Sequence, residues 1–280
     1  MWWSEDGRAW FVSTDLPDGD GAELAAVELG GPGLIAAGRS GRGPAIWVSA
    51  DGRTWRPADP ASDVSDLSIN TIAQGPLGWL AIGTGLGPRG TSGVAVASAD
   101  GERWTRTDPI DGGRPIPPMQ TGGALPDGRW AVVTSLEAGG SSGTYASNDG
   151  LAWTPAPELG AMNGLGGFVP FRDRIVAFGL RSTTVRWSLD AVAWRDVSIP
   201  ADAAEAIETI TVPRTDEVAL LGTGRSGPLL LRSSDAQDWT RDDISGEAGR
   251  STAYDMAALG RVEVVVGISD GVSAIWIRER

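Results

Sequence analysis

One seven-residue pattern recurs six times along the chain and constrains the fold more than any other feature. Four copies read S-x-D-G-x-x-W, whereas the last two have Ala191 and Ala236 in place of the Gly. The copies occupy Ser4–Trp10, Ser49–Trp55, Ser98–Trp104, Ser147–Trp153, Ser188–Trp194 and Ser233–Trp239. Their tryptophans are 45, 49, 49, 41 and 45 residues apart. A period in this range is typical of repeat architectures, in which each repeat is one supersecondary unit.

Each copy predicts a tight turn, and we call the six segments the Ser-Asp-Trp turns. The Ser hydroxyl and the Asp carboxylate can accept hydrogen bonds from the N–H groups of the turn, and Gly adopts the positive φ angle. The Trp that follows is large enough to pack between neighbouring repeats.

The segments between the turns predict four β-strands per repeat. A short apolar run that mostly ends in Gly recurs in every repeat, as in Trp79–Gly83, and a second apolar stretch leads into each turn. In the second repeat the expected strands are Ile69–Ala73, Trp79–Gly83, Val94–Ser98 and Trp104–Thr107. An antiparallel meander of ~45 residues is typical of one β-propeller blade. A β-solenoid usually has shorter coils, and a pair of sandwiches would not repeat at one period.

The turns resemble Asp-box (BNR) repeats, which occur in the β-propellers of the sialidase-like superfamily. The six copies extend this resemblance over nearly the whole chain. In that family the Asp box caps the outer hairpin of each blade, far from the ligand face. The resemblance therefore implies a fold rather than a catalytic site.

We predict one all-β domain over residues 1–280, a six-bladed β-propeller of four-stranded antiparallel blades. The chain finishes with a third strand, 271–278, where a turn and a fourth strand should follow. It starts with those pieces, so segment 1–13 is expected to complete the last blade and close the ring. Trp10–Ser13 would then pair with Ala274–Ile277. One conflict remains, because Trp2 and Trp276 align to the same column of the third strand.

Composition excludes several classes of function. The chain has no His, so a His-based triad and a His-ligated metal site are ruled out, and it has no Cys for a disulfide framework. A formal net charge of −13 disfavours nucleic-acid binding. No apolar run approaches the ~18 residues of a membrane helix. We expect no cofactor, no metal and no membrane insertion, and a monomer that the resemblance to Asp-box propellers places outside the cell or in its envelope.

Candidate ligand-binding residues lie in the loops between the second and third strands, at the end of each blade opposite the Ser-Asp-Trp turns. Propeller function usually resides in such loops of variable length. These loops carry five arginines, which suit bidentate binding of carboxylate, sulfate or phosphate: Arg39, Arg42, Arg89, Arg181 and Arg225. The alternative is that these arginines form surface salt bridges with aspartates of the neighbouring connections, which would stabilise little.

Two further candidates, Tyr254 and Asp255, stand in the expected innermost strand of the last repeat. The sialidase catalytic set includes an Arg-Ile-Pro segment and a Tyr nucleophile, and this chain has no Arg-Ile-Pro. We therefore expect a non-catalytic binding propeller that recognises a glycan or protein ligand, and the loop arginines suit an anionic one. The competing function is a glycoside hydrolase or lyase of sialidase-like fold that uses Tyr254, Asp255 or loop carboxylates. Two carboxylates within reach of one small molecule would favour the enzyme.

Overall fold

A computed structural model gives the structure of this protein. The structure describes residues 2–12, 23–30, 33–40, 43–60, 67–87, 90–108, 110–111, 114–135, 143–180, 182–200, 204–225, 227–244 and 251–280. The chain divides into two compact units, which are described separately. The first unit comprises Met1–Trp3 and Phe11–Asn163, and the second comprises Ser4–Trp10 and Gly164–Arg280.

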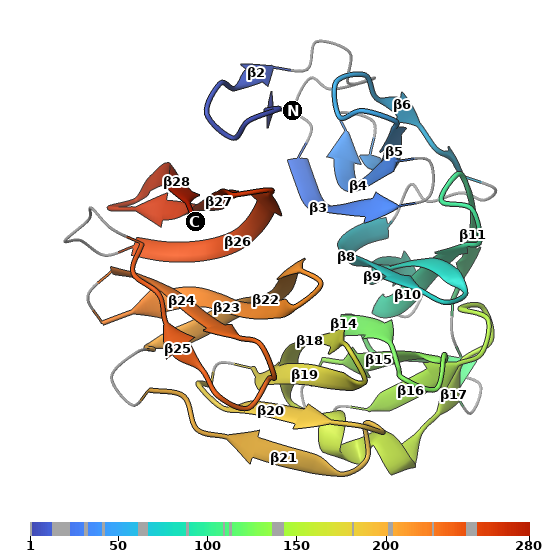
Figure 1. The fold of residues 1–280 in the computed structure, drawn as a ribbon. Helices are drawn as coiled ribbons and strands as arrows, with labels where there is room; N and C mark the ends of the chain where they lie inside the picture. Colours follow the sequence, from blue (N-terminus) through green and yellow to red (C-terminus); the bar gives the residue numbers. More distant parts are fainter. Residues whose placement is uncertain are drawn as a thin grey trace. The chain divides into compact units, whose positions relative to one another are not determined.

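The described part of the first unit contains three four-stranded antiparallel meanders (Figure 1). The first is β3 (Glu23–Gly30), β4 (Gly33–Ser40), β5 (Gly43–Ser49) and β6 (Arg56–Pro57). The second is β8 (Leu67–Gly75), β9 (Gly78–Gly87), β10 (Gly90–Ser98) and β11 (Arg103–Thr107), and the short β7 (Asp59–Pro60) pairs with β11 in parallel. The third is β14 (Met119–Ala124), β15 (Trp130–Thr134), β16 (Thr144–Ser147) and β17 (Thr154–Pro155).

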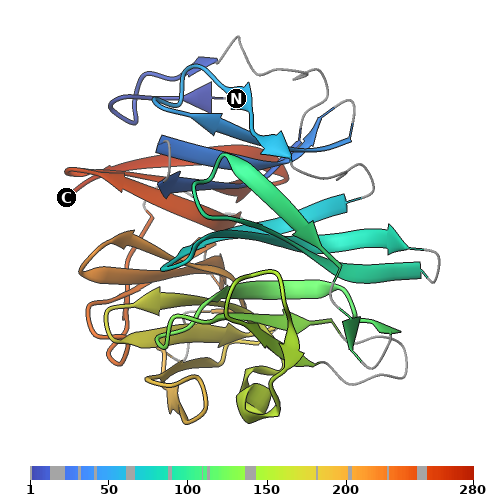
Figure 2. The same ribbon diagram turned by 90° about the vertical axis from the view of Figure 1, so that its right-hand side faces the viewer.

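Three short elements complete the first unit. They are the hairpin β1 (Trp2–Trp3) and β2 (Phe11–Val12), the hairpin β12 (Ile110–Asp111) and β13 (Arg114–Pro115), and the 3-10 helix Pro157–Met162. The helix, drawn as a coil in Figure 2, follows β17. It buries Leu159 and Met162.

The second unit contains two four-stranded meanders and one of three strands among the described residues. The first is β18 (Leu165–Phe171), β19 (Arg174–Gly179), β20 (Val185–Ser188) and β21 (Trp194–Val197). The second is β22 (Ala206–Arg214), β23 (Glu217–Gly224), β24 (Gly227–Ser233) and β25 (Thr240–Arg241). The three-stranded one is β26 (Ser251–Leu259), β27 (Val262–Ser269) and β28 (Val272–Glu279). The last two are joined where Thr223 pairs with Thr252, whose hydroxyls lie 2.8 Å apart. The all-β class and the four-stranded meander predicted for the second repeat are confirmed, since each predicted strand lies within β8, β9, β10 or β11.

The N-terminal segment differs from the expectation that Trp10–Ser13 pairs with Ala274–Ile277. Instead, β2 pairs with β1, so that Trp2 faces Val12 and Trp3 faces Phe11. The reason is that Trp2–Trp3 precedes its Ser-Asp-Trp turn just as a third strand does in every other repeat. The fourth strand therefore already has a partner within its own hairpin, which also accounts for the shared alignment column of Trp2 and Trp276.

The first strand of every described meander carries a β-bulge at the same position. The bulged residues are Ala25, Asn70, Gln120, Gly166, Glu208 and Tyr254. In each case the preceding residue pairs with the end of the recurring apolar run, which is a Gly in five of the six meanders. At Gly222 a Cβ atom would overlap the carbonyl oxygen of Ala206 in the neighbouring strand. Cβ atoms at Gly83 and Gly267 would overlap the first strand in the same way, so at these three positions the bulge brings that strand too close for a side chain.

The Ser-Asp-Trp turns have the geometry that their sequence predicts. In all six, one carboxylate oxygen of the Asp accepts hydrogen bonds from the backbone N–H groups two and three residues later, at 2.8–3.1 Å. These bonds hold the pKa of each Asp below its ordinary value. The fourth residue has φ between 63° and 77° in all six, including Ala191 and Ala236. These Asp residues are therefore committed to holding the turns.

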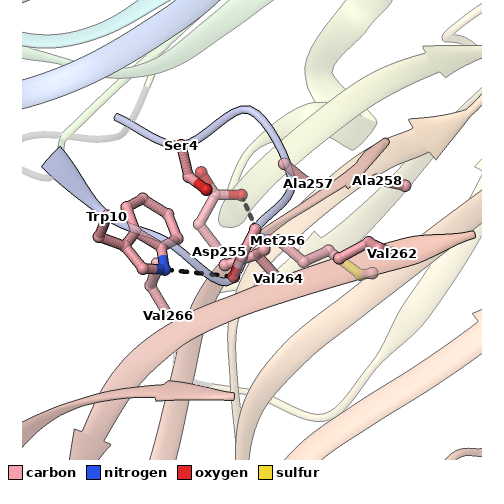
Figure 3. A pocket seen from close by; sticks show the side chains of 10 residues that line it. Ser4, Trp10, Asp255, Met256, Ala257, Ala258, Val262, Val264 and Val266 are labelled. Atoms are coloured by element: carbon pink, nitrogen blue, oxygen red, sulfur yellow. Dashed lines mark hydrogen bonds between the residues drawn. The ribbon is translucent and has the colours of Figure 1, made fainter. Parts of the chain in front are cut away.

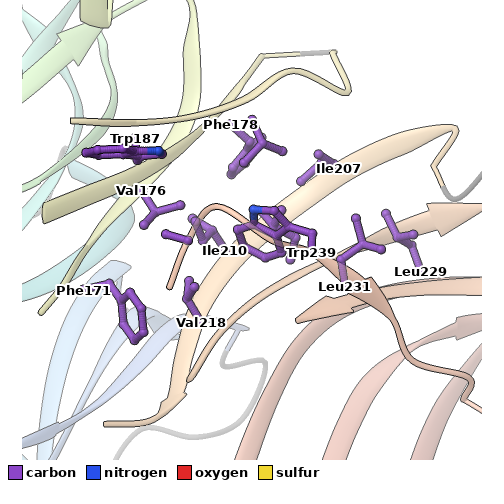
Figure 4. Close-up of a cluster of buried hydrophobic side chains, with 13 residues drawn as sticks. Phe171, Val176, Phe178, Trp187, Ile207, Ile210, Val218, Leu229, Leu231 and Trp239 are labelled. Atoms are coloured by element: carbon purple, nitrogen blue, oxygen red, sulfur yellow. The ribbon is translucent and has the colours of Figure 1, made fainter. Parts of the chain in front are cut away.

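The core consists of apolar side chains between successive sheets. Figure 4 shows one such cluster in the second unit, in which Phe178 and Trp187 of one meander lie near Ile207 and Leu231 of the next. Val218, Leu229 and Leu231 of this cluster are fully buried. Trp187 and Tyr145, which both stand in the third strand of a meander, are also buried.

Candidate functional site

A cavity of about 280 Å³ lies in the second unit, between the N-terminal Ser-Asp-Trp turn and the sheet formed by β26 and β27 (Figure 3). The lining residues are Ser4, Gly7, Trp10, Asp255, Met256, Ala257, Ala258, Val262, Val264 and Val266. Most of these residues are apolar. The sequence brings them together because Val262, Val264 and Val266 alternate along β27 and so share one face of the sheet.

The glycine of the N-terminal turn fixes the distance between the two walls. Gly7 has φ of 72°, and a Cβ at this position would lie 2.7 Å from a methyl of Val262 and 2.9 Å from a methyl of Val264. Gly150 in the third meander has a similar position, because a Cβ there would lie 2.9 Å from Ala97 in the preceding sheet. The N-terminal turn thus contacts β27 in the way that a Ser-Asp-Trp turn contacts its neighbouring sheet.

Asp255 is the one residue with a formal charge that lines this cavity. Its Oδ1 accepts a hydrogen bond of 2.8 Å from the backbone N–H of Met256, and Figure 3 shows its carboxylate pointing toward Ser4. The side chain remains accessible to water because the cavity is open, yet the surrounding protein atoms desolvate it. This desolvation raises the pKa of Asp255 above its ordinary value, and the hydrogen bond from Met256 opposes it only in part.

The remaining polar groups near the cavity are occupied by the turn itself. The Ser4 hydroxyl donates to Asp6 at 3.1 Å, and the indole N–H of Trp10 donates to the carbonyl of Gly7 at 3.2 Å. The guanidinium of Arg8 pairs with Glu279 at the end of β28. None of the ion pairs found among the described residues involves Asp255.

The cavity lies on one face of the sheet of β26 and β27, from the middle of these strands towards the loop that joins them. Its walls are the N-terminal Ser-Asp-Trp turn and the residues beside the short loop from β26 to β27, whereas the predicted ligand-binding loops leave the opposite end of each sheet. Asp255, which the sequence placed in the ligand-binding set, thus belongs to a different surface from the loop arginines of its unit. Tyr254 is the bulged residue of β26, has 45% of its surface exposed and does not line the cavity.

The structure places two of the five predicted arginines. Arg39 is the last residue but one of β4, next to the turn into β5, and Arg225 lies between β23 and β24. Both side chains are exposed. Arg42, Arg89 and Arg181 lie outside the described residues. Within the described ranges, no ion pair of Arg39 or Arg225 is found.

The aspartates that were considered as salt-bridge partners for these loops bind other arginines. Asp108 pairs with Arg106 of its own sheet, and Asp243 lies 3.8 Å from Arg241. Asp242 pairs with two arginines of β24 and β28. Among the described residues, these three aspartates therefore have partners other than Arg39 and Arg225.

A buried network of charges, which the sequence did not predict, joins the last two meanders of the second unit. At its centre Arg232 of β24 binds Glu263 at 2.6 Å, Asp242 at 2.7 Å, and Glu217. Glu263 of β27 is fully buried, and Arg232 is 4% exposed. Three further arginines contact the same carboxylates: Arg214, Arg278 and Arg280.

Electrostatics in the network favour the charged forms. Burial opposes the ionisation of Asp242, but the hydrogen bonds and charges of Arg278 and Arg232 outweigh it and hold the pKa of Asp242 below its ordinary value. A hydrogen bond to Glu217 raises the pKa of Arg280. Because every carboxylate in the network binds at least two arginines, we assign it a structural role rather than a catalytic one.

The described residues contain no group of three or more acidic side chains placed to hold a metal ion. In the same part of the chain, no helix is long and apolar enough to cross a membrane.

Comparison with known proteins identifies the fold but not a family. No family model matches the chain, and no curated protein matches it. Among solved structures, virginiamycin B lyase from Staphylococcus aureus is similar with a TM-score of 0.56 and 10% identity, over 90% of this chain and 83% of that one. The extracellular domain of the one-component system BT4673 from B. thetaiotaomicron is similar with a TM-score of 0.57 and 10% identity. That match covers 92% of this chain and 34% of the other.

A further similarity is to YCF48 bound to a D1 peptide, with a TM-score of 0.49, 16% identity, and coverage of 92% of this chain and 94% of that one. The two structures with the higher TM-scores, virginiamycin B lyase and the extracellular domain of BT4673, are β-propeller-like. The chain is thus an all-β protein of mostly antiparallel four-stranded sheets with propeller-like structural neighbours.

Proposed function

We propose that this protein is a non-catalytic binding propeller that recognises a glycan or protein ligand through the loops opposite the Ser-Asp-Trp turns. The ligand is anionic, and its acidic groups are bound by Arg39, Arg42, Arg89, Arg181 and Arg225. The proposal includes a ring of six blades, kinship with the Asp-box propellers, a monomeric state, and a position outside the cell or in its envelope.

One observation carries this proposal: the loop arginines that the structure describes are exposed and unpaired with described carboxylates. Arg39 lies one residue before the end of β4 and Arg225 directly follows β23, so both stand where the second strand of a meander turns into the third. A guanidinium that no described carboxylate engages retains its capacity for a bidentate carboxylate or phosphate contact. The Ser-Asp-Trp turns do not compete for this role, because their carboxylates are engaged by backbone N–H groups.

The competing function, a glycoside hydrolase or lyase, receives less support from the described cavity. Glycoside hydrolysis generally uses two carboxylates, ~5–10 Å apart, on either side of the scissile bond. The cavity between the N-terminal turn and β27 is lined by Asp255 alone among acidic residues. Tyr254 lies outside this lining, so the two residues considered for catalysis do not share the cavity.

The experiment that tests the proposal is a glycan and peptide array with acidic and neutral members, screened with the full chain. The strongest acidic hit is then measured with Arg39, Arg89 and Arg225 changed together to Ala. We expect binding to fall at least about tenfold, as for the loss of a charge-assisted hydrogen bond.

The matched control changes three arginines at the other end of the sheets, Arg8, Arg53 and Arg103, also together to Ala. This variant removes the same charge from the Ser-Asp-Trp turns and should bind the hit as the unmodified chain does. Equal affinity in the two triple variants, or hits without acidic groups, would show that the loop arginines are solvated surface and would overturn the proposal.

A further inference from the structure

The cavity beside the N-terminal Ser-Asp-Trp turn combines one carboxylate with an apolar lining. Asp255 supplies the charge, and Val262, Val264 and Val266 form a continuous apolar strip along β27. One oxygen of Asp255 is bound by the N–H of Met256, and no ion pair or other hydrogen bond of this side chain is found among the described residues. This carboxylate therefore has one neutral protein donor, and its side chain remains open to a partner that enters the cavity.

We infer that this cavity binds a small organic ammonium ion, with the ammonium on the Asp255 carboxylate and the apolar body against the valines of β27. The proposal goes beyond the anion-binding loops, because it concerns a ligand of opposite charge on a different surface. Its success or failure is therefore independent of the function proposed above.

The charges around the cavity favour a cation. Arg8 is the basic residue of the N-terminal turn, and its guanidinium is taken by Glu279. Asp6 lies in the same turn and keeps its negative charge, because its hydrogen bonds lower its pKa. A cation entering the cavity would thus meet the Asp255 carboxylate and no free guanidinium of the turn. Desolvation already raises the pKa of Asp255, so an ammonium ion would relieve an existing cost.

The shape of the cavity selects the size of the ligand. A volume of 280 Å³ corresponds to roughly nine water molecules at ~30 Å³ each, and thus to an organic molecule with few carbon atoms. The indole of Trp10 lines the same cavity as Asp255 and offers a cation a second attractive surface. Apolar walls, one carboxylate and one indole together fit an alkylammonium ion better than a sugar, which would need several hydrogen-bonding partners.

The test compares three ligands of matched size by calorimetric titration: pentylammonium, 1-pentanol and pentanoate. We expect pentylammonium to bind at least about tenfold more tightly than 1-pentanol, the factor associated with one charge-assisted hydrogen bond. Pentanoate should not bind. Amide chemical shifts in NMR spectra should change for residues 255–258 and for the N-terminal turn.

The deciding variant is Asp255→Asn, which keeps an oxygen for the N–H of Met256 but removes the charge. It should bind pentylammonium at least about tenfold more weakly and no longer distinguish it from 1-pentanol. The control is Asp216→Asn, which removes an exposed carboxylate between β22 and β23 and should leave binding unchanged. Absence of pentylammonium binding, equal binding of the alcohol, or full binding by a folded Asp255→Asn protein would each overturn the inference.

Discussion

Replacing Arg232 by Met should destabilise the protein more than any surface substitution, because it removes the centre of the buried charge network. The guanidinium is 4% exposed and binds three carboxylates, of which Glu263 is fully buried. Met fills a similar volume but cannot bind these carboxylates, so their remaining ion pairs are with arginines that are more exposed than Arg232. Glu263 keeps Arg214 at 3.2 Å and Arg280 at 3.5 Å, both longer than its lost contact of 2.6 Å.

The expected loss is about 3–5 kcal/mol of unfolding free energy, which is the usual cost of removing one partner of a buried ion pair. For a domain of this size, each kcal/mol lowers the melting temperature by about 2–4 °C. The melting temperature should therefore fall by roughly 6–20 °C in a thermal scan followed by circular dichroism. Urea unfolding gives the free energy directly.

Two further variants decide whether this reasoning is right. Arg186→Met removes an arginine whose partner Asp196 is 74% exposed, and it should cost less than about 1 kcal/mol. Combining Arg232→Met with Glu263→Gln should cost less than the sum of the single changes, because Gln removes the charge that Met leaves unpaired. A loss below ~1 kcal/mol for Arg232→Met, or additive effects in the double variant, would refute a buried network held by Arg232.

Three other perturbations test the remaining features. Gly222→Ala should lose roughly 1–3 kcal/mol or more, because the methyl meets the backbone of Ala206, whereas Gly160→Ala meets nothing within 4 Å and should be neutral in the same urea titration. The six turn aspartates have pKa values in the folded protein below their ordinary value of 3.8, so the stability that they contribute is complete above about pH 4 and is lost as the pH falls through the folded pKa values. Tryptophan fluorescence should show cooperative acid unfolding in that range, and an unchanged fold at pH 2 would contradict this. The pKa of Asp255 is shifted in the opposite direction, so the charged carboxylate lowers the stability of the fold above this raised pKa. The Asp255→Asn variant should therefore be more stable than the unmodified chain at pH 7, with a difference that vanishes towards pH 4, and a less stable variant at pH 7 would argue against a desolvated carboxylate.

Much of the fold could be predicted because the turn chemistry is local. In the second turn, for example, Ser49 and Asp51 accept hydrogen bonds from backbone N–H groups at most three residues away, so a seven-residue pattern contains nearly all the information for that turn. The strands of the second repeat followed from the apolar runs between the turns. The predicted pairing of Trp10–Ser13 with Ala274–Ile277 was wrong, because both Trp2 and Trp276 align as third strands. In the structure the fourth strand pairs locally with Trp2–Trp3.

The sites were less accessible to sequence reasoning, because they depend on contacts between distant segments. Nothing near Asp255 in the sequence shows that residues 4–10 cover it. The charge network did leave a signal: Glu263 stands in a column that Leu34, Trp79 and Val218 fill in other repeats. A charged residue at an apolar position predicts a buried partner, and Arg232 is the one the structure supplies.

The contact of Gly7 with Val262 and Val264 has a consequence for the order in which the protein folds. Most neighbouring strands are joined by short loops, whereas these contacts join residues about 250 positions apart. The entropy of closing a loop grows with the logarithm of its length, so this contact costs roughly 2 kcal/mol more than one between residues ~20 apart. Contacts of such high sequence separation form slowly. The N-terminal turn should therefore dock after the meanders have formed, and the amides of β27 beneath it should gain protection from hydrogen exchange later than those of β23.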